Sequence, residues 1–558
     1  MTGGRESRAS NNTAARLVFV AVAAAGLALF LWGALAAPVV VNSDTALDLQ
    51  WARSGPLRAS VPGIPHPPKP GYLLFLAAAT RAFPGLGETR SVVVVQSVVM
   101  WGAIVFAAAR LSRGRGLQAG LALFVLLLIF ARLRDSANAV LSDCLAASLC
   151  LALVALCLEP PRSRAALAAL GAGFALLFWV RPNVGAVATF LGAVLLFGAP
   201  GRRRRTIVAV AFTALMVPAW ILTRAKSGGD PLRGLGAPIL MGSAPYYWLP
   251  QPGSWSGGDS REQLRLAAAH WRALASQPAP DRSREILWRA LHGIFGVELY
   301  DSRWSPGYRA WDAFSRRASP FLLAGAVAVL LAGTIFASRL TTAERLAAPL
   351  LLAMLVAHDL VFGSHPRYIL AFLPALLLLA VDHGAALGPS RRGWLVAAAI
   401  GLGLLGLFRR NRGIVDWEWG LVEASGVRIA QEIPARELPA TGPATIHIRI
   451  APPLLPTGAG LQLLGPGGEV LWSRGPNASG EPYLTASLPE SLLEANRSGP
   501  VRLTLVATGS YDDTHYLLFP VVPRPWGASA RRDASADLSP GSGVASGSLD
   551  WWAHAGAP

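Results

Sequence analysis

The chain has 558 residues, of which 53% are hydrophobic and only 15% are charged, and its mean hydropathy is +0.42. This balance excludes an ordinary soluble protein and predicts a polytopic membrane protein. The formal net charge of +18 comes almost entirely from arginine, since Lys69 and Lys226 are the only lysines among 50 basic residues. The arginines stand in short clusters between apolar runs, where they would set membrane orientation, so we expect no nucleic-acid partner.

Eleven apolar runs predict an α-helical bundle of about eleven transmembrane helices. Several runs are shorter than the roughly 20 residues that a full span needs, so their helices must extend into flanking polar sequence. The first run follows three arginines and is predicted to be an uncleaved span rather than a removed leader. The runs cover residues 17–37, 91–109, 117–131, 139–158, 165–180, 184–197, 206–222, 321–337, 346–362, 368–381 and 394–408.

Arginine clusters predict how these spans are oriented, because short cytoplasmic loops are basic. With residues 1–16 as a cytoplasmic N-terminus, every short loop on the cytoplasmic side carries arginines. The long segments 40–90 and 223–319 then lie outside, together with everything after Arg409. We therefore predict a transmembrane domain at 17–408 in the plasma (inner) membrane, with an extracytoplasmic C-terminal part. The cytoplasmic arginines are Arg110, Arg113, Arg115, Arg162, Arg164, Arg202 to Arg205, Arg339, Arg345, Arg391 and Arg392.

The two long outer loops have features of their own. A short apolar stretch at 71–83 is predicted to be a helix lying in the outer interface, because counting it as a span would invert every later loop. The loop at 223–319 has helix-like amphipathic stretches at 261–276 and 282–299 and many aromatic residues. These aromatics would either line an acceptor cleft or anchor the loop at the interface.

After Trp419 the pattern changes to short alternating runs separated by Gly, Pro and Asn, which predicts an extracytoplasmic β-sandwich at 420–526. This domain would be either a carbohydrate-binding module or a structural cap. Residues 527–558 are rich in Ser, Gly, Ala and Asp, which predicts a disordered tail. The predicted strands cover 445–450, 461–464, 469–472, 483–488, 501–507 and 516–522.

Asp44, in the sequence Asn-Ser-Asp-Thr at 42–45, is the candidate catalytic residue. A carboxylate just outside the first span could act as a general base and take a proton from an attacking hydroxyl. Alternatively, Ser43 or Asp44 would cap a helix over 45–53. Asp48 lies about one helical turn later and is a candidate substrate-binding residue.

Cationic side chains follow at places that the topology puts at the outer ends of spans. Prolines around His66 and Lys69 fix an extended approach, so these two side chains would be held beside the interfacial helix. Arg181 and Arg367 would place guanidinium groups, which suit phosphate oxygens, at the same depth. Snorkelling and interfacial anchoring are the alternative interpretations of these cations. His358 and Asp359, about one turn inside the outer end of a span, could form an ion pair or bind a metal, and we expect structural pairing.

Five of these residues would share one leaflet surface between the two long outer loops: Asp44, Lys69, Asp143, Arg181 and Arg367. A cationic pocket with a carboxylate suits a phosphate leaving group and a nucleophile to deprotonate. Salt bridges within the cluster Arg132, Arg134, Asp135 and Asp143 would also explain Asp143. Asp44 or His365 could hold a divalent cation, although their spacing does not require one.

The order of these motifs resembles the GT-C membrane glycosyltransferases, nearest to the branch of the protein O-mannosyltransferases and the aminoarabinose transferases that modify lipid A. The resemblance covers most of residues 15–408. It rests on the acidic residue after the first span, His-Pro-Pro-Lys-Pro-Gly-Tyr at 66–72, Leu-Ser-Asp-Cys-Leu at 141–145, Phe-Trp-Val-Arg-Pro at 178–182, and His-Pro-Arg-Tyr at 365–368.

The resemblance implies transfer of a sugar from a polyprenyl-phosphate donor, with Asp44 as the catalytic or substrate-orienting carboxylate. The acceptor would be an extracytoplasmic glycan, lipid or protein. The mannosyltransferase pattern has Asp-Glu where this chain has Asp44-Thr45, which argues against protein mannosylation. The predicted substrate-binding residues are Asp48, His66, Lys69, Asp143, Arg181, His365, Arg367 and Tyr368.

Two other classes of protein are compatible with these features. A glycan or lipid transporter would also have many spans, but it would usually show internal symmetry and broken helices near the midplane. A non-catalytic membrane scaffold that displays the β-sandwich would tolerate Asp44→Asn, whereas the proposed enzyme would not.

Overall fold

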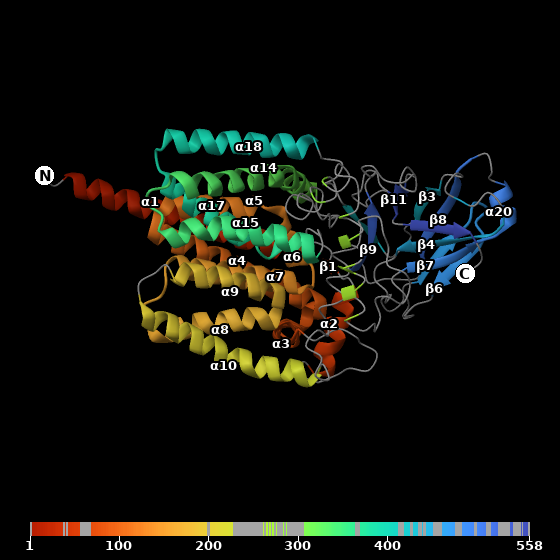
Figure 1. Cartoon of the computed structure of the whole chain (residues 1–558), viewed down its shortest axis with the longest axis horizontal. Coiled ribbons are helices and arrows are strands. Elements are labelled where there is room, and N and C mark those ends of the chain that lie inside the picture. The colour runs from red at the N-terminus through yellow and green to blue at the C-terminus, as the bar shows by residue number, and fades with distance from the viewer. Residues whose placement is uncertain are drawn as a thin grey trace.

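The computed structural model places a bundle of helices at one end of the molecule and β-strands at the other (Figure 1). It describes the bundle over 3–36, 39–40, 43–55, 69–197, 201–226, 306–362 and 369–410, with isolated positions between 261 and 286. In the C-terminal part it describes 418–423, 428–433, 438, 442–449, 460–474, 483–495, 499–508, 515–522, 536–538, 548–549 and 551–555. The aromatic loop predicted at 223–319 therefore lies largely outside the described residues.

Each of the eleven predicted apolar runs overlaps a helix in the described part of the chain. Three segments, Leu17–Ala36, Glu88–Arg115 and Ala318–Phe336, are long and apolar enough to cross a membrane by length and composition. A membrane protein is thus supported, while eleven crossings remain a prediction. The helices are α1 (Gly3–Ala36), α4 (Glu88–Arg115), α5 (Leu117–Ile129), α7 (Ser142–Leu158), α8 (Arg164–Val180), α9 (Pro182–Phe197), α10 (Arg202–Lys226), α14 (Pro306–Phe336), α15 (Thr342–Phe362), α17 (Leu373–Leu387) and α18 (Arg391–Arg410).

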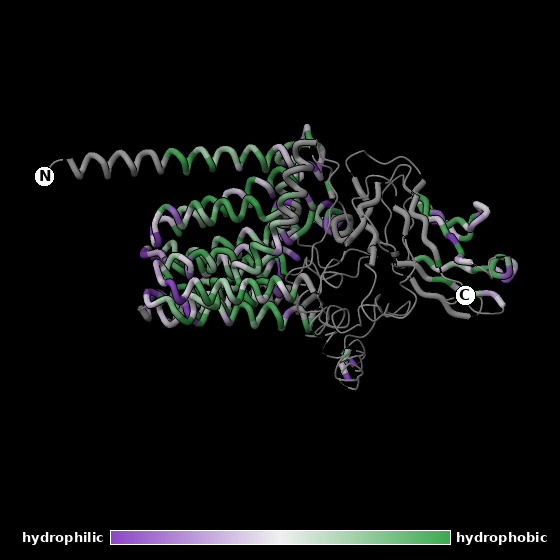
Figure 2. The backbone as a smooth tube through the Cα atoms, turned by 90° about the horizontal axis from the view of Figure 1, so that it is seen from above, coloured by the Kyte–Doolittle hydropathy of each residue, from purple (hydrophilic) through white to green (hydrophobic). Residues whose placement is uncertain are grey.

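The bundle is apolar both inside and on its surface. One cluster of buried apolar residues runs through the described helices from Phe30 to Ala380. On the surface, Leu395 and Leu402 are each 70% exposed. Figure 2 shows the helices hydrophobic along their length, with hydrophilic residues gathered toward their ends. A surface of this kind is suited to contact with lipid, because water would penalise so much exposed apolar area.

The two ends of the bundle differ in character. One end, called here the basic end, consists of the short connections between α4 and α5, α7 and α8, α9 and α10, α14 and α15, and α17 and α18 (Figure 1). The opposite end, called the loop end, carries four short helices and the β-strands. These helices are α2 (Ser43–Ser54), α3 (Pro70–Ala79), η1 (Pro84–Leu86) and α6 (Ala131–Asn138). With ten residues, α3 is too short to cross a membrane, as predicted for this apolar stretch.

The C-terminal strands form three sheets, and each of the six predicted strands is present. Pairing is antiparallel except between β1 and β9. The helix α20 (Glu490–Ala495) follows β7. The first sheet has β1 (Val39–Val40), β9 (His515–Val522) and β11 (Ser548–Leu549), with β2 (Glu418–Glu423) also on β9. The second has the order β10 (Ala536–Leu538), β3 (Arg428–Ile433), β8 (Val501–Thr508), β5 (Gly460–Leu464), β6 (Val470–Arg474). The third has β12 (Trp551–Ala555), β4 (Ala444–Arg449), β7 (Tyr483–Leu488).

The segment 527–558, predicted from its composition to be a disordered tail, contributes one strand to each sheet. Strand β12 pairs along its whole length with β4, from Trp551 opposite Ile448 to Ala555 opposite Ala444. Tryptophan is among the residues that favour strands, so this local run differs from the average composition of the segment. The structure therefore differs from the sequence prediction at β10, β11 and β12.

A parallel pairing joins the chain just after α1 to the C-terminal domain. Val39 lies opposite His515 and Val40 opposite Tyr516, so β1 adds to the sheet through β9. The Val39 side chain is fully buried. Because β1 leads within three residues into α2, the β domain helps to position the start of α2.

Helix α3 packs closely on α8 through Gly71, and this contact predicts a loss of stability on substitution. A Cβ atom at Gly71 would lie 2.9 Å from the Cβ of Trp179, closer than such atoms normally approach. We expect Gly71→Ala to lower the free energy of unfolding by about 1–3 kcal/mol. The thermal unfolding midpoint of the purified protein should fall as well. Gly102→Ala is the matched control, since nothing lies within 4 Å of a Cβ there. An unchanged midpoint for Gly71→Ala would contradict this packing.

Candidate functional site

The loop end holds those predicted site residues that the structure describes. Helix α2 begins at Ser43, so Asp44 lies in its first turn. The predicted helix over 45–53 is thus present, and a carboxylate is favoured at its start by the helix dipole. The side chain of Asp44 lies outside the described part of the structure, and so do His66, His365, Arg367 and Tyr368.

An ion pair joins α2 to the start of α3. The Lys69 ammonium donates to Asp48 at 3.3 Å from Nζ to Oδ2, and the two side chains are 29% and 14% exposed. Pro70 occupies the first turn of α3 and favours the helix start directly after Lys69. The pair is only partly shielded from solvent, so Lys69 stays accessible to an anion that would compete with Asp48.

A second ion pair lies deeper in the bundle. The Arg181 guanidinium contacts the Asp143 carboxylate, and their side chains are only 9% and 1% exposed. Arg181 ends α8, and Asp143 lies in the first turn of α7. Arg181 is 38 residues from Asp143 in the sequence, so this contact joins distant parts of the chain. Because both charges are buried, removing either one would leave the other without compensation and would destabilise the fold.

The two ion pairs lie on touching elements. Gly71, two residues after Lys69, packs directly against Trp179, two residues before Arg181. The predicted phosphate-binding cations from the first outer loop and from the α8–α9 junction are therefore brought to the same end of the bundle.

Two further polar contacts stabilise this end, and the sequence analysis did not identify the partners. Asn183 on α9 hydrogen-bonds His358 on α15 at 2.9 Å, which agrees with the structural pairing expected for His358. Tyr72 donates to Gln96 at 3.4 Å, and the Gln96 amide donates to the carbonyl oxygen of Ala139 at 2.8 Å. Through Gln96, α3 and α4 hold the turn that precedes Asp143. A glutamine inside an apolar run was the available signal, because buried polar groups in spans need partners.

The described residues contain no group of three His, Cys, Asp or Glu side chains that could hold a metal ion. Asp44 and His365, suggested above as cation ligands, are outside what is described at the side-chain level. In the described part of the site, Lys69 is paired with Asp48 and Arg181 with Asp143.

Comparison with solved structures finds similarity to ArnT and to the arabinofuranosyltransferase AftD. ArnT from Cupriavidus metallidurans in the apo state is 15% identical over 67% of this chain and 78% of that chain, with a TM-score of 0.32. The structure of the same protein bound to undecaprenyl phosphate is 16% identical over 66% of this chain and 77% of that chain, with a TM-score of 0.32. A mutant of the arabinofuranosyltransferase AftD from mycobacteria is 18% identical over 70% of this chain but only 27% of that chain, with a TM-score of 0.34.

Of these two proteins, AftD is named as an arabinofuranosyltransferase. No protein-family profile matches the chain, and no curated protein sequence matches it.

Proposed function

We propose that the chain is a GT-C-type membrane glycosyltransferase that moves a sugar from a polyprenyl-phosphate donor to an acceptor outside the cytoplasm. The observation that carries this proposal is the placement of Lys69 and Arg181 on touching elements beside the helix that bears Asp44. Two cations and a carboxylate at one edge of an apolar bundle suit a lipid-linked phosphate and a hydroxyl nucleophile. The acceptor class is a glycan, lipid or protein of the cell envelope.

In the proposed reaction the acceptor hydroxyl attacks the anomeric carbon of the donor sugar. Asp44 accepts the hydroxyl proton as the new glycosidic bond forms. The bond between the anomeric carbon and the phosphate oxygen breaks, and polyprenyl phosphate leaves with inversion of configuration. Lys69, Arg181 and Arg367 would stabilise the negative charge that grows on the leaving phosphate, a contribution of several kcal/mol in a preorganised site.

The proposal also orients the molecule in the plasma (inner) membrane. The basic end would face the cytoplasm, since its short connections carry arginines. The loop end and the β domain would then lie outside, where a lipid-linked donor and an envelope acceptor meet. The β domain would either bind carbohydrate or serve as a structural cap.

The test is release of polyprenyl phosphate by the purified full-length protein from a panel of polyprenyl-phosphate sugars, with acceptor extracts supplied. We expect turnover of one donor and a fall in kcat/KM of about 100-fold in Lys69→Gln, because the leaving phosphate loses a charged partner. Arg53→Gln is the matched control: Arg53 is an exposed cation on α2 that pairs with Glu88. No turnover of any donor would favour the transporter or the scaffold.

A further inference from the structure

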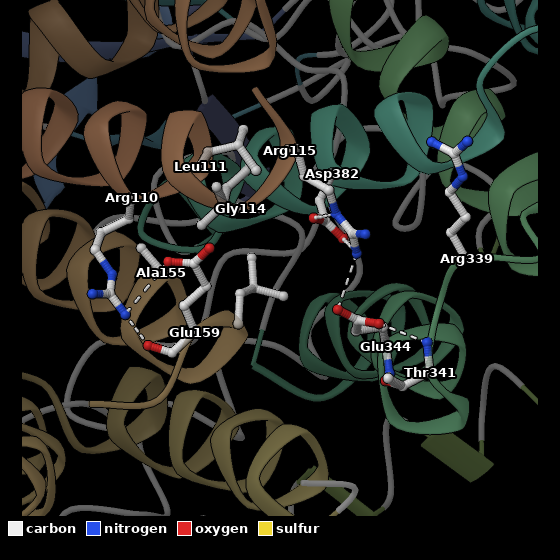
Figure 3. Close-up of a pocket in the computed structure, with 12 residues that line it drawn as sticks. Arg110, Leu111, Gly114, Arg115, Ala155, Glu159, Arg339, Thr341, Glu344 and Asp382 are labelled. Atoms are coloured by element: carbon white, nitrogen blue, oxygen red, sulfur yellow. Dashed lines mark hydrogen bonds and ion pairs between the residues drawn. The ribbon is translucent and has the colours of Figure 1, made fainter. Parts of the chain in front are cut away.

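A cavity of about 260 Å³ lies at the basic end of the bundle, far from the site at the loop end. Residues of α4, α7, α15 and α17 line it, together with the connections that follow α7 and α14 (Figure 3). Its charged lining residues are Arg110, Arg115, Glu159, Arg339, Glu344 and Asp382. From the sequence alone, these arginines predict only membrane orientation.

Two of the three carboxylates are held by Arg115. Its Nε lies 2.7 Å from Asp382 Oδ1, and its Nη2 lies 3.1 Å from Glu344 Oε1. Glu344 also closes a capping box at the start of α15, since its Oε2 accepts from the Thr341 backbone N–H at 2.6 Å. Thr341 Oγ1 in turn accepts from the Glu344 N–H at 3.3 Å. Both carboxylates are therefore fixed and balanced by charge or hydrogen bonds.

The third carboxylate, Glu159, lies 3.8 Å from Arg110, whose guanidinium also donates to the Glu159 carbonyl oxygen. Glu159 covers Gly114 so closely that a Cβ there would collide with its carboxylate. The Nε of Arg110 is buried and has no hydrogen-bond partner among the described residues.

Arg339 completes the lining from the connection between α14 and α15. Its side chain has no hydrogen bond or ion pair with the described residues, and Figure 3 shows it apart from the bonded groups. The cavity therefore has an unused guanidinium on Arg339, while each of its carboxylates already faces an arginine. Such a lining attracts an anion rather than a cation.

We propose that this cavity binds a phosphate-bearing anion, with Arg339 as its main charged contact. Guanidinium groups match the geometry of phosphate oxygens and bind them in pairs of hydrogen bonds. If the bundle spans the membrane, the basic end lies at headgroup depth, where anionic lipids concentrate. The shared ligand chemistry is a phosphate group, carried either by a lipid headgroup or by a soluble phosphate compound. The proposal does not depend on the glycosyltransferase activity.

The experiment is a native mass spectrometry titration of the full-length protein in detergent with three probes: dioctanoylphosphatidylglycerol, dioctanoylphosphatidylcholine and inorganic phosphate. We expect Arg339→Gln to weaken binding about tenfold, as for loss of a charged hydrogen bond. Arg113→Gln is the matched control, because Arg113 is exposed at the same end of α4 but does not line the cavity. That variant should bind like the wild type.

The three probes identify the source of the phosphate. Stronger binding of phosphatidylglycerol than of the other two, lost in Arg339→Gln, supports an anionic lipid headgroup. Binding of inorganic phosphate as tight as that of the lipids, with the same loss, supports a soluble phosphate compound. Equal binding of all probes by the wild type, Arg339→Gln and Arg113→Gln would overturn the proposal, as would no binding of any probe.

Discussion

Asp44→Asn is expected to reduce sugar transfer by about 10³-fold in kcat/KM, the middle of the range for loss of a general base. An amide is nearly the same size as the carboxylate and is tolerated at a helix start, so the first turn of α2 should persist. The measurement is release of polyprenyl phosphate from the donor that the wild type uses.

Glu88→Gln makes the same chemical change at the loop end without touching the proposed reaction. Glu88 begins α4 and pairs with Arg53 on the exposed surface, where an ion pair contributes little. Full activity in Glu88→Gln and loss in Asp44→Asn, with unchanged unfolding midpoints in both, would assign the proton transfer to Asp44. Equal turnover in both variants would remove Asp44 from the mechanism.

Asp143→Asn is expected to produce the largest loss of stability, about 3–5 kcal/mol, because it leaves the Arg181 guanidinium buried without its carboxylate. The thermal unfolding midpoint of the purified protein should fall accordingly. By contrast, Asp48→Asn should lower the free energy of unfolding by about 1 kcal/mol or less, since the ion pair between Asp48 and Lys69 is partly exposed.

A double variant distinguishes an unpaired charge from a general packing defect. In Asp143→Asn/Arg181→Gln the buried charge is gone as well, so part of the lost stability should return. The pairing would be contradicted if the double variant lost more free energy of unfolding than the two single variants lose together. Stability is the readout here, because Arg181 also belongs to the proposed phosphate site.

The helices and most strands could be predicted from local pattern, because each run carries its own periodicity. The run at 91–109 became α4 with only a few residues added at either end, and the alternating segment 483–488 became β7 at the same bounds. Strands β2 and β3 were missed, since charged residues at Glu418, Glu432 and Arg428 obscure their short apolar alternation. Strand β12 was not predicted, because the segment around it is rich in Ser, Gly, Ala and Asp.

Partner choice within the site was harder to predict than position. Arg181 contacts Asp143, 38 residues away in the sequence, because α7 and the α8–α9 junction are brought together by tertiary packing. The pair of Lys69 with Asp48 similarly joins residues 21 positions apart. Local sequence shows that such charges must be satisfied in or near a membrane, but only the packing of the helices decides by which partner.

The pairing of β1 with β9 has a consequence for the order in which the protein is made. His515 follows its partner Val39 by 476 residues. At bacterial-like rates of 5–20 residues per second, roughly 25–95 s of synthesis separate the two strands. The segment leading into α2 thus receives its β partner only after all the bundle helices have been synthesised. The Asp44 region is then completed later than the bundle that it borders.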